Sequence, residues 1–217
     1  MSTFAVVPVK NLLKSKNRLS HIFTFQERSL FTLAMLQDVL NALRSSNITR
    51  TVVVSSDPTV AQFVKDFGIT FLQETREGLN QALSQATRWC VRNKAETVLF
   101  FPADVPLITS KDITQLVNLA DEDSIVISPS RNGGTNALLQ SPPGLISPCF
   151  GLDSFKKHIA KASAKHVRIK IYASLNVILD IDSEEDLEQL LKVGDHTVSH
   201  SFLQQHQKQG SVKLGDI

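Results

Sequence analysis

The stretch 98-VLFFPADVPL-107 decides the fold class of this chain, because an apolar run of strand type ends there in an acid, Asp104. A second apolar run, 176-NVILDIDSEEDL-187, carries Asp180 and Asp182. A carboxylate buried without a partner costs several kcal/mol, so acids that directly follow apolar runs normally face a crevice, a metal or a helix N-terminus. We therefore expect the three acids to meet at the carboxyl edge of a parallel sheet, where open α/β folds bind ligands, and to hold Mg²⁺ for phosphate chemistry.

Short runs rich in Val, Ile and Phe alternate along the chain with segments of helical period, which is typical of parallel βαβ units. Strands are predicted at residues 4–7, 51–55, 69–72, 97–101, 124–128, 136–139, 169–173 and 177–181. The fourth-last and third-last strands, and the last two, follow each other without a helix, so some strands are antiparallel. The predicted fold is α/β, with a single-domain, mixed, mostly parallel sheet flanked by helices.

Helix signals fill the segments between the strands. Helices are predicted at residues 25–43 and 78–93, and from an N-cap at Asp57 to Gly68. Another helix follows the Asp104 loop, with Thr109 or Ser110 as its cap, and the last regular helix starts at Ser183.

The composition limits the class of protein. A chain of 217 residues with 42% hydrophobic and 20% charged residues is typical of a globular protein, and we expect one domain over residues 1–194 with 195–217 as a polar tail or peripheral extension. A net charge of +2 gives no support for binding nucleic acid or a membrane. Cys90 and Cys149 are too few for a disulfide framework, and no signal peptide or long apolar run occurs, so we expect a reducing cytoplasm. The six histidines show no metal-ligand spacing, and we expect most of them to be solvated.

The segment 7-VPVKNLLKSKNRLS-20 places Lys10, Lys14, Lys16 and Arg18 in the connection after the first strand. Cations at this edge of a sheet can bind phosphates, although a solvated basic loop has the same composition. No GxGxxG or GxxxxGK[ST] motif is present, so a dinucleotide-dependent oxidoreductase or a P-loop enzyme is disfavoured.

Taken in order, the motifs resemble those of one family. The segments VPVK, KSKNRLS, VVVSSD, GLNQAL, FPADVPL, GGTNALL, FGLDSFKKH and LDIDSEEDL together are similar to the 2-phospho-L-lactate guanylyltransferase family over roughly residues 4–192. The resemblance implies a fold related to glycosyltransferase-A-type nucleotidyltransferases. It also implies a reaction of GTP with 2-phospho-L-lactate to give lactyl-2-diphospho-5′-guanosine and pyrophosphate, a step in making the deazaflavin coenzyme F-420.

The resemblance also implies roles for individual residues. It makes Asp104, Asp180 and Asp182 ligands of Mg²⁺, with Asp104, Lys16 and Arg18 as catalytic residues. Nucleotide-binding residues would be Lys10, Lys16, Arg18, Ser56, Asp57, Gly78 and Asn80, and the acceptor pocket would hold Thr135, Asn136, Gly151 and Ser154. Each has a simpler structural explanation, because Asp, Asn and Ser are common helix caps and glycines make turns.

Several alternatives stay open from the sequence. A molybdopterin or sugar-phosphate nucleotidyltransferase would share the fold and the metal, but the glycine-rich start of those enzymes is absent. A non-catalytic nucleotide-binding domain could keep the sheet and lose turnover. The acceptor could be 2-phospholactate or phosphoenolpyruvate, which differ only in hydrogen count. A homodimer is expected only because dimers are the commonest assembly.

Overall fold

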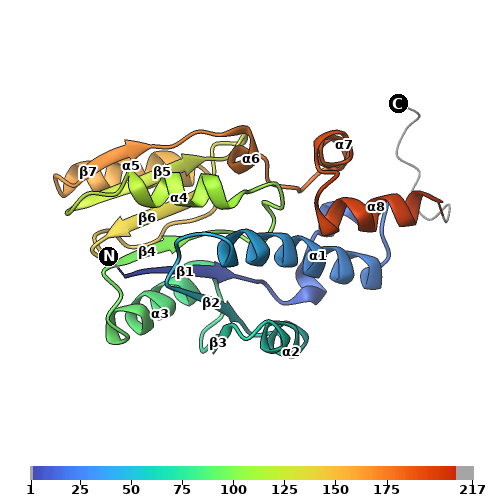
Figure 1. Cartoon of the computed structure of the whole chain (residues 1–217), viewed down its shortest axis with the longest axis horizontal. Helices are drawn as coiled ribbons and strands as arrows, with labels where there is room; N and C mark the ends of the chain where they lie inside the picture. The colour runs from blue at the N-terminus through green and yellow to red at the C-terminus, as the bar shows by residue number, and fades with distance from the viewer. Residues whose placement is uncertain (1, 209–217) are drawn as a thin grey trace.

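A seven-stranded sheet forms the centre of the molecule in the computed structural model, which describes residues 2–208 (Figure 1). The strand order is β3-β2-β1-β4-β6-β5-β7. The strands are β1 (Thr3–Pro8), β2 (Arg50–Ser55), β3 (Thr70–Gln73), β4 (Thr97–Phe100), β5 (Ser124–Pro129), β6 (Thr135–Ser141) and β7 (Arg168–Ile171). Strand β6 runs antiparallel to β4 and β5, and every other pairing in the sheet is parallel. The prediction of an α/β fold with a mixed, mostly parallel sheet is confirmed.

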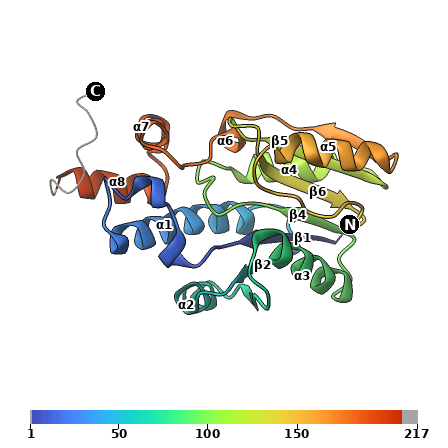
Figure 2. The same cartoon turned by 180° about the vertical axis from the view of Figure 1, so that it is seen from behind.

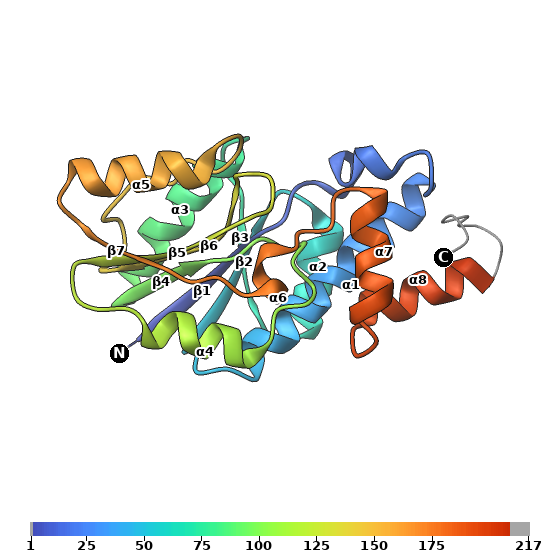
Figure 3. The same ribbon diagram turned by 90° about the horizontal axis from the view of Figure 1, so that it is seen from above.

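Helices cover both faces of this sheet. The helices of the described residues are η1 (Leu12–Lys14), η2 (Asn17–Leu19), α1 (Phe25–Arg44), α2 (Pro58–Asp66), α3 (Leu79–Arg92), α4 (Ser110–Asn118), α5 (Ser154–Ala164), α6 (Leu175–Ile178), α7 (Glu184–Val193) and α8 (Val198–Lys208). Helices α3 and α5 lie on one face, in front in Figure 2, and α1 and α4 lie on the other, as Figure 3 shows from above. Each face has its own buried cluster: Leu40 and Ile113 pack on the α1 side, and Leu83 and Ala162 on the α3 side. The result is a three-layer α/β/α domain.

Local signals predicted several helix ends correctly. Asp57 caps α2 by accepting hydrogen bonds from the amides of Thr59 (2.8 Å) and Val60 (3.4 Å), and Pro58 opens the helix. Gly68 follows the helix with a φ of +65°, a conformation that glycine adopts without strain. Thr109 caps α4 in a capping box.

The predicted strand at residues 177–181 is wrong. Residues Leu175–Ile178 form the short helix α6, and residues 179–182, which follow it, do not pair in the sheet. The side chain of Asn136 on β6 donates from Nδ2 to the carbonyl oxygens of Val177 (2.9 Å) and Ile178 (3.1 Å). A side chain therefore binds the carbonyls that a neighbouring strand would have paired, and Asp180 and Asp182 follow a helical turn.

The C-terminal segment packs into a third buried cluster beyond the carboxyl ends of the strands. Helix α8 packs against α1, where Asp38 accepts hydrogen bonds from the amides of Val198 (2.7 Å) and Ser199 (3.0 Å). Leu203 on α8 is fully buried with Leu187 and Leu190 of α7. Within the expected tail, Val198–Lys208 is therefore a packed helix at the periphery of the domain, and residues 209–217 lie outside the described residues.

The burial of the cysteines and histidines differs in part from what the sequence predicts. Cys90 is buried and Cys149 half-buried, and both carry free thiols. The expectation of solvated histidines is wrong for His158 and His200, which are buried. Between residues 2 and 208, every helix is too short or too polar to cross a membrane.

Candidate functional site

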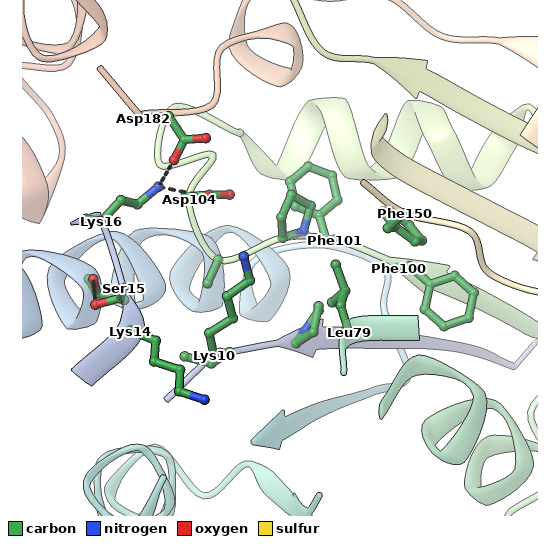
Figure 4. A pocket seen from close by; sticks show the side chains of 15 residues that line it. Lys10, Lys14, Ser15, Lys16, Leu79, Phe100, Phe101, Asp104, Phe150 and Asp182 are labelled. Carbon is green, nitrogen blue, oxygen red and sulfur yellow. Dashed lines mark hydrogen bonds and ion pairs between the residues drawn. The ribbon is translucent and has the colours of Figure 1, made fainter. Parts of the chain in front are cut away.

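Two adjoining cavities lie at the carboxyl edge of the sheet. The smaller has a volume of about 180 Å³ and lies between the loop after β1 and the loop after β4; Figure 4 shows its lining. The larger, about 540 Å³, lies beside it over the loops that follow β2 and β3. Five residues line both cavities: Pro8, Val9, Lys10, Lys14 and Leu79. The two spaces therefore form one cleft at the edge where α/β sheets of this kind bind ligands.

Lys16 binds two of the three predicted acids at the inner end of the smaller cavity. Its Nζ lies 2.7 Å from Oδ2 of Asp104 and 2.7 Å from Oδ1 of Asp182, and it also donates to the carbonyl oxygen of Ile181 at 2.5 Å (Figure 4). The Ile181 amide in turn donates to the Asp104 carbonyl oxygen at 2.9 Å, so a backbone hydrogen bond joins the two acidic loops. Lys16 has a φ of +48°, a left-handed conformation that costs a non-glycine residue roughly 1 kcal/mol. Strain of this kind clusters at functional sites.

Lys16 and Asp182 shift each other's pKa. The Lys16 side chain is only 6% exposed, and burial alone would lower its pKa, but Asp104 and Asp182 outweigh burial and raise the pKa above its usual value. Burial would likewise raise the pKa of Asp182, yet Lys16, Arg18 and Lys10 lower it below the usual range. Lys16 and Asp182 are therefore both charged at neutral pH, and the cationic loop acts on the acids directly.

Asp180 lies in a different electrostatic environment from Asp182. Burial is the main cause that raises its pKa, and the negative charges of Asp104 and Asp182 raise it further. Its Oδ1 accepts a hydrogen bond of 3.3 Å from Nδ2 of Asn136. The three predicted acids thus lie close enough to repel one another. The carboxylates of Asp104 and Asp182 do not face each other across an open space, because the Lys16 ammonium group lies between them. Across residues 2–208, no group of three or more His, Cys, Asp and Glu side chains is arranged to enclose a metal ion.

The predicted nucleotide-binding residues divide into two groups. Ser56 and Gly78 line the larger cavity, and Lys10 lines both cavities. Asp57 and Asn80 line neither: besides capping α2, Asp57 accepts a hydrogen bond from the Leu12 amide at 2.9 Å and so holds the cationic loop.

Asn80 forms a pair of hydrogen bonds with a loop on the other side of the cleft. Its Oδ1 accepts from the Phe150 amide at 2.7 Å, and its Nδ2 donates to the Phe150 carbonyl oxygen at 3.0 Å. The Phe150 ring lines the smaller cavity beside Phe100 (Figure 4). Both polar atoms of the Asn80 side chain bind the Phe150 backbone, so Asn80 holds this loop in the structure; its contact with the base or ribose stays a prediction.

Arg18 is the catalytic candidate that the structure places farthest from the cavities. It is exposed and lines neither of them, although its charge contributes to the low pKa of Asp182. Lys14 lines both cavities and forms an exposed ion pair of 2.7 Å with Glu77 across the larger one, and in Figure 4 it points away from the acids.

Three of the predicted acceptor residues, Thr135, Gly151 and Ser154, bond to one another, whereas Asn136 bonds to Asp180, and all four lie outside the lining of the two cavities. Ser154 Oγ donates to Thr135 Oγ1 at 3.1 Å, and the Ser154 amide donates to the Gly151 carbonyl oxygen at 3.1 Å. Because β6 is antiparallel, its first residue, Thr135, lies at the same edge as the carboxyl ends of the parallel strands. Asn136, the next residue, bonds to Val177, Ile178 and Asp180, so its amide is used within the protein.

Sequence reasoning missed two residues that hold the site together. Asp186, which is buried, accepts hydrogen bonds from the amides of Asp182 (2.9 Å) and Ser183 (2.8 Å) and forms an ion pair with Arg131. His158 bonds to Thr135 and to the loop at Cys149. The burial of His158 could have been found, because Ser154, His158 and Ala162 recur at every fourth residue and so share one face of α5.

Comparison with known proteins agrees with this geometry. The family described as "Guanylyl transferase CofC like" matches residues 3–214. A phosphoenolpyruvate guanylyltransferase of Rubrobacter xylanophilus is 41% identical over 192 residues, which are 88% of this chain and 94% of that protein. A 2-phospho-L-lactate guanylyltransferase of Methanocaldococcus infernus is 35% identical over 92% of this chain and 89% of that protein.

Solved structures show the same fold at low sequence identity. A candidate nucleotide-diphospho-sugar transferase from Desulfovibrio desulfuricans superposes with a TM-score of 0.80 at 15% identity, covering 96% of each chain. A CMP:2-keto-3-deoxy-manno-octonic acid synthetase solved with CTP gives a TM-score of 0.62 at 12% identity, covering 90% of this chain and 99% of that one. The fold is that of the nucleotide-diphospho-sugar transferases, and by the family match and the identity to its relatives this chain belongs to the CofC-like guanylyl transferases.

Proposed function

We propose that this protein transfers the guanylyl group of GTP to the phosphate of a three-carbon acid, 2-phospho-L-lactate or phosphoenolpyruvate, and releases pyrophosphate. The names of its relatives support the reaction class and both acceptors. The observation that carries the proposal in this chain is Lys16, whose ammonium group lies between Asp104 and Asp182 at the inner end of the cleft. Positive and negative side chains that are buried together beside a cavity are suited to the transfer of a nucleotidyl group between polyanionic phosphates.

The nucleotide fits the cleft in one direction. The larger cavity, with Ser56 and Gly78 in its lining, has room for the base and ribose. The smaller cavity leads from Lys10 to Lys16 and suits the phosphates, because cations there would bind their charge. Arg18 would add charge from outside the cavity.

The carboxylate oxygens of the three acids are of the ligand type that Mg²⁺ prefers, because a hard cation binds oxygen. Asp104 and Asp182 would hold it, with Asp180, whose pKa is raised by burial and by the negative charges of Asp104 and Asp182. Mg²⁺ bound there would neutralise phosphate charge and orient the reacting oxygens. Lys16 would have to leave the two acids for this, and its charge would then be free to bind the phosphates.

The reaction needs no general base. An oxygen of the acceptor phosphate, already anionic near neutral pH, attacks the α-phosphorus of GTP in line with the leaving group. The bond from the α-phosphorus to the oxygen bridging the β-phosphorus breaks, and its electron pair leaves with pyrophosphate. The obstacle is repulsion between two polyanions, which Lys10, Lys16 and Arg18 reduce by taking up charge on the departing pyrophosphate.

The test is to follow pyrophosphate in the presence of Mg²⁺ with each pairing of GTP, ATP, CTP or UTP with 2-phospho-L-lactate or phosphoenolpyruvate. We expect release with GTP and at least one of the two acids, and none without an acid. Binding of GTP without release would favour the alternative of a non-catalytic nucleotide-binding domain. Release with another nucleotide and no release with GTP would favour a related nucleotidyltransferase.

The cellular setting extends the proposal. The product would feed the synthesis of coenzyme F-420. A cytoplasmic location and a homodimer stay predictions from composition and from the frequency of dimers among soluble proteins.

A further inference from the structure

His158 on α5 is fully buried and bonds to two segments of the predicted acceptor pocket. Its Nδ1 lies 3.0 Å from Thr135 Oγ1 on β6, and its Nε2 lies 3.0 Å from the backbone nitrogen of Cys149. Its ring also packs edge-on against that of Phe150, with 4.9 Å between the ring centres. One side chain therefore contacts the strand, the loop and the helix that together form this pocket.

The hydrogen on His158 can be assigned from its partners. A backbone amide can only donate, so the Cys149 amide requires an Nε2 that carries no hydrogen. Burial, with a smaller contribution from the charge of Lys161, lowers the pKa of His158 to about 4, so the ring is neutral at physiological pH. A neutral ring without hydrogen on Nε2 carries it on Nδ1, which therefore donates towards Thr135 Oγ1 and the Ser154 backbone carbonyl.

This tautomer decides what the two neighbouring hydroxyls can offer a ligand. Thr135 and Ser154 lie 3.1 Å apart, so one hydroxyl donates to the other. With Nδ1–H pointing at Thr135, one hydroxyl hydrogen of the pair is left without an acceptor among the described residues. With the opposite tautomer, Thr135 would donate to the ring, Ser154 would donate to Thr135, and no hydrogen would remain.

The loop on the other side of His158 is fixed from both ends. The Cys149 amide binds His158, and the Phe150 amide and carbonyl bind Asn80 of α3. Gly151 follows with a φ of +121°, a conformation that favours glycine, and accepts from the Ser154 amide. Residues 149–151 are thus held between a helix on the nucleotide side and a helix on the acceptor side.

We propose that His158 is a positioning residue for the acceptor acid: its Nδ1–H directs a hydroxyl hydrogen of the Thr135–Ser154 pair towards an anionic oxygen of that acid, while its Nε2 holds the Cys149–Gly151 loop. This inference rests on the proposed function for the identity of the acid, but the tautomer follows from the protein alone. His158 does not touch the reacting atoms, and its effect passes through Thr135, Ser154 and Gly151.

The kinetic test compares three substitutions of His158. We expect His158→Phe to raise the KM for the acceptor roughly tenfold, because the free hydroxyl hydrogen of the pair is no longer directed at the acid and the Cys149 amide loses its acceptor, and to leave the KM for GTP within about twofold. His158→Asn can keep a donor near Nδ1 and should recover most of the loss, whereas His158→Gln can keep only the contact near Nε2 and should recover less. His166→Asn, at an exposed histidine just beyond the same helix, is the matched control and should change neither KM.

Equal rises in the two KM values, or an Asn variant no better than the Gln variant, would overturn the proposal. Nitrogen-15 NMR of the histidine rings in the full chain is independent of turnover and should show His158 with its hydrogen on Nδ1; a hydrogen on Nε2 would also overturn it. Absence of turnover in the unmodified enzyme with either acid would instead contradict the proposed function, and the NMR result would still decide the tautomer.

Discussion

Nζ of Lys16 and Oδ2 of Asp104 lie 2.7 Å apart, although 88 positions separate the two residues in the chain. The contact joins the cationic loop after β1 to the acidic loop after β4, two neighbouring parallel strands. Asp182 completes the arrangement by binding the same ammonium group at 2.7 Å. The positive charge of Lys16 thus partly neutralises the negative charges of Asp104 and Asp182.

Removing that charge should destabilise the protein and make it respond more to metal. We expect Lys16→Met to lower the free energy of unfolding by about 1 to 3 kcal/mol, because Asp104 and Asp182 lose their cation but stay partly exposed to solvent. Mg²⁺ should then raise the melting temperature of the variant more than that of the unmodified protein. The control is Lys14→Met, since the pair of Lys14 with Glu77 is exposed. An equal response to Mg²⁺ in all three proteins would show that Lys16 and the metal do not compete.

Loss of the Asn80 side chain should weaken the acceptor side of the cleft. Asn80→Ala removes both hydrogen bonds to the Phe150 backbone, and we expect a loss of roughly 1 to 3 kcal/mol in urea unfolding with a higher KM for the acceptor. Asn41→Ala, at an exposed position of α1, serves as the control. A higher KM for GTP with an unchanged KM for the acceptor would instead support the predicted nucleotide contact of Asn80.

Stability should fall in mild acid because of His158. Its pKa is about 4 in the folded protein and near 6.5 when unfolded, so between these values the unfolded chain binds the extra proton. Stability contributed by the neutral ring is complete above pH 6.5 and is lost as the pH falls towards 4, by about 3 kcal/mol in total. Urea unfolding from pH 7.5 to 4.5 should show this slope in the unmodified protein and a shallower one in His158→Gln. Parallel slopes in the two proteins would contradict the assignment.

Helix α8 should depend on Asp38. Its carboxylate accepts from the Val198 and Ser199 amides and from Ser199 Oγ at 2.6 Å, which are the interactions of a helix cap supplied from another helix. We expect Asp38→Ala to lower the free energy of unfolding by about 1 to 3 kcal/mol and to speed amide hydrogen exchange first in residues 198–208. Exchange that accelerates equally throughout the chain would show that α8 unfolds only with the whole domain.

Features set by neighbouring residues could be predicted from the sequence. Asp57 and Pro58 start α2 and Thr109 starts α4 because a cap acts within one helical turn. The parallel strands followed from their apolar runs. The place of Asp104 at the carboxyl edge followed from the end of its strand.

Features set by distant partners could not be predicted. The run at residues 177–181 has the composition of a strand, but Asn136 binds its carbonyls across the fold. The buried face of α5 could be predicted from its spacing, but the bonds of His158 to β6 and to the Cys149 loop could not. The place of the Lys16 ammonium group between Asp104 and Asp182 also lies beyond sequence, because it depends on distances between three loops.

The most direct test of guanylyl transfer at the acidic cluster is pyrophosphate release by Asp104→Asn with GTP, Mg²⁺ and the better of the two acids. We expect turnover to fall by a factor of about a thousand or more with the fold retained by circular dichroism, since an amide neither binds Mg²⁺ as a carboxylate does nor pairs with Lys16. Asp195→Asn, at a side chain 90% exposed, should keep full turnover. Normal pyrophosphate release by Asp104→Asn would contradict the account.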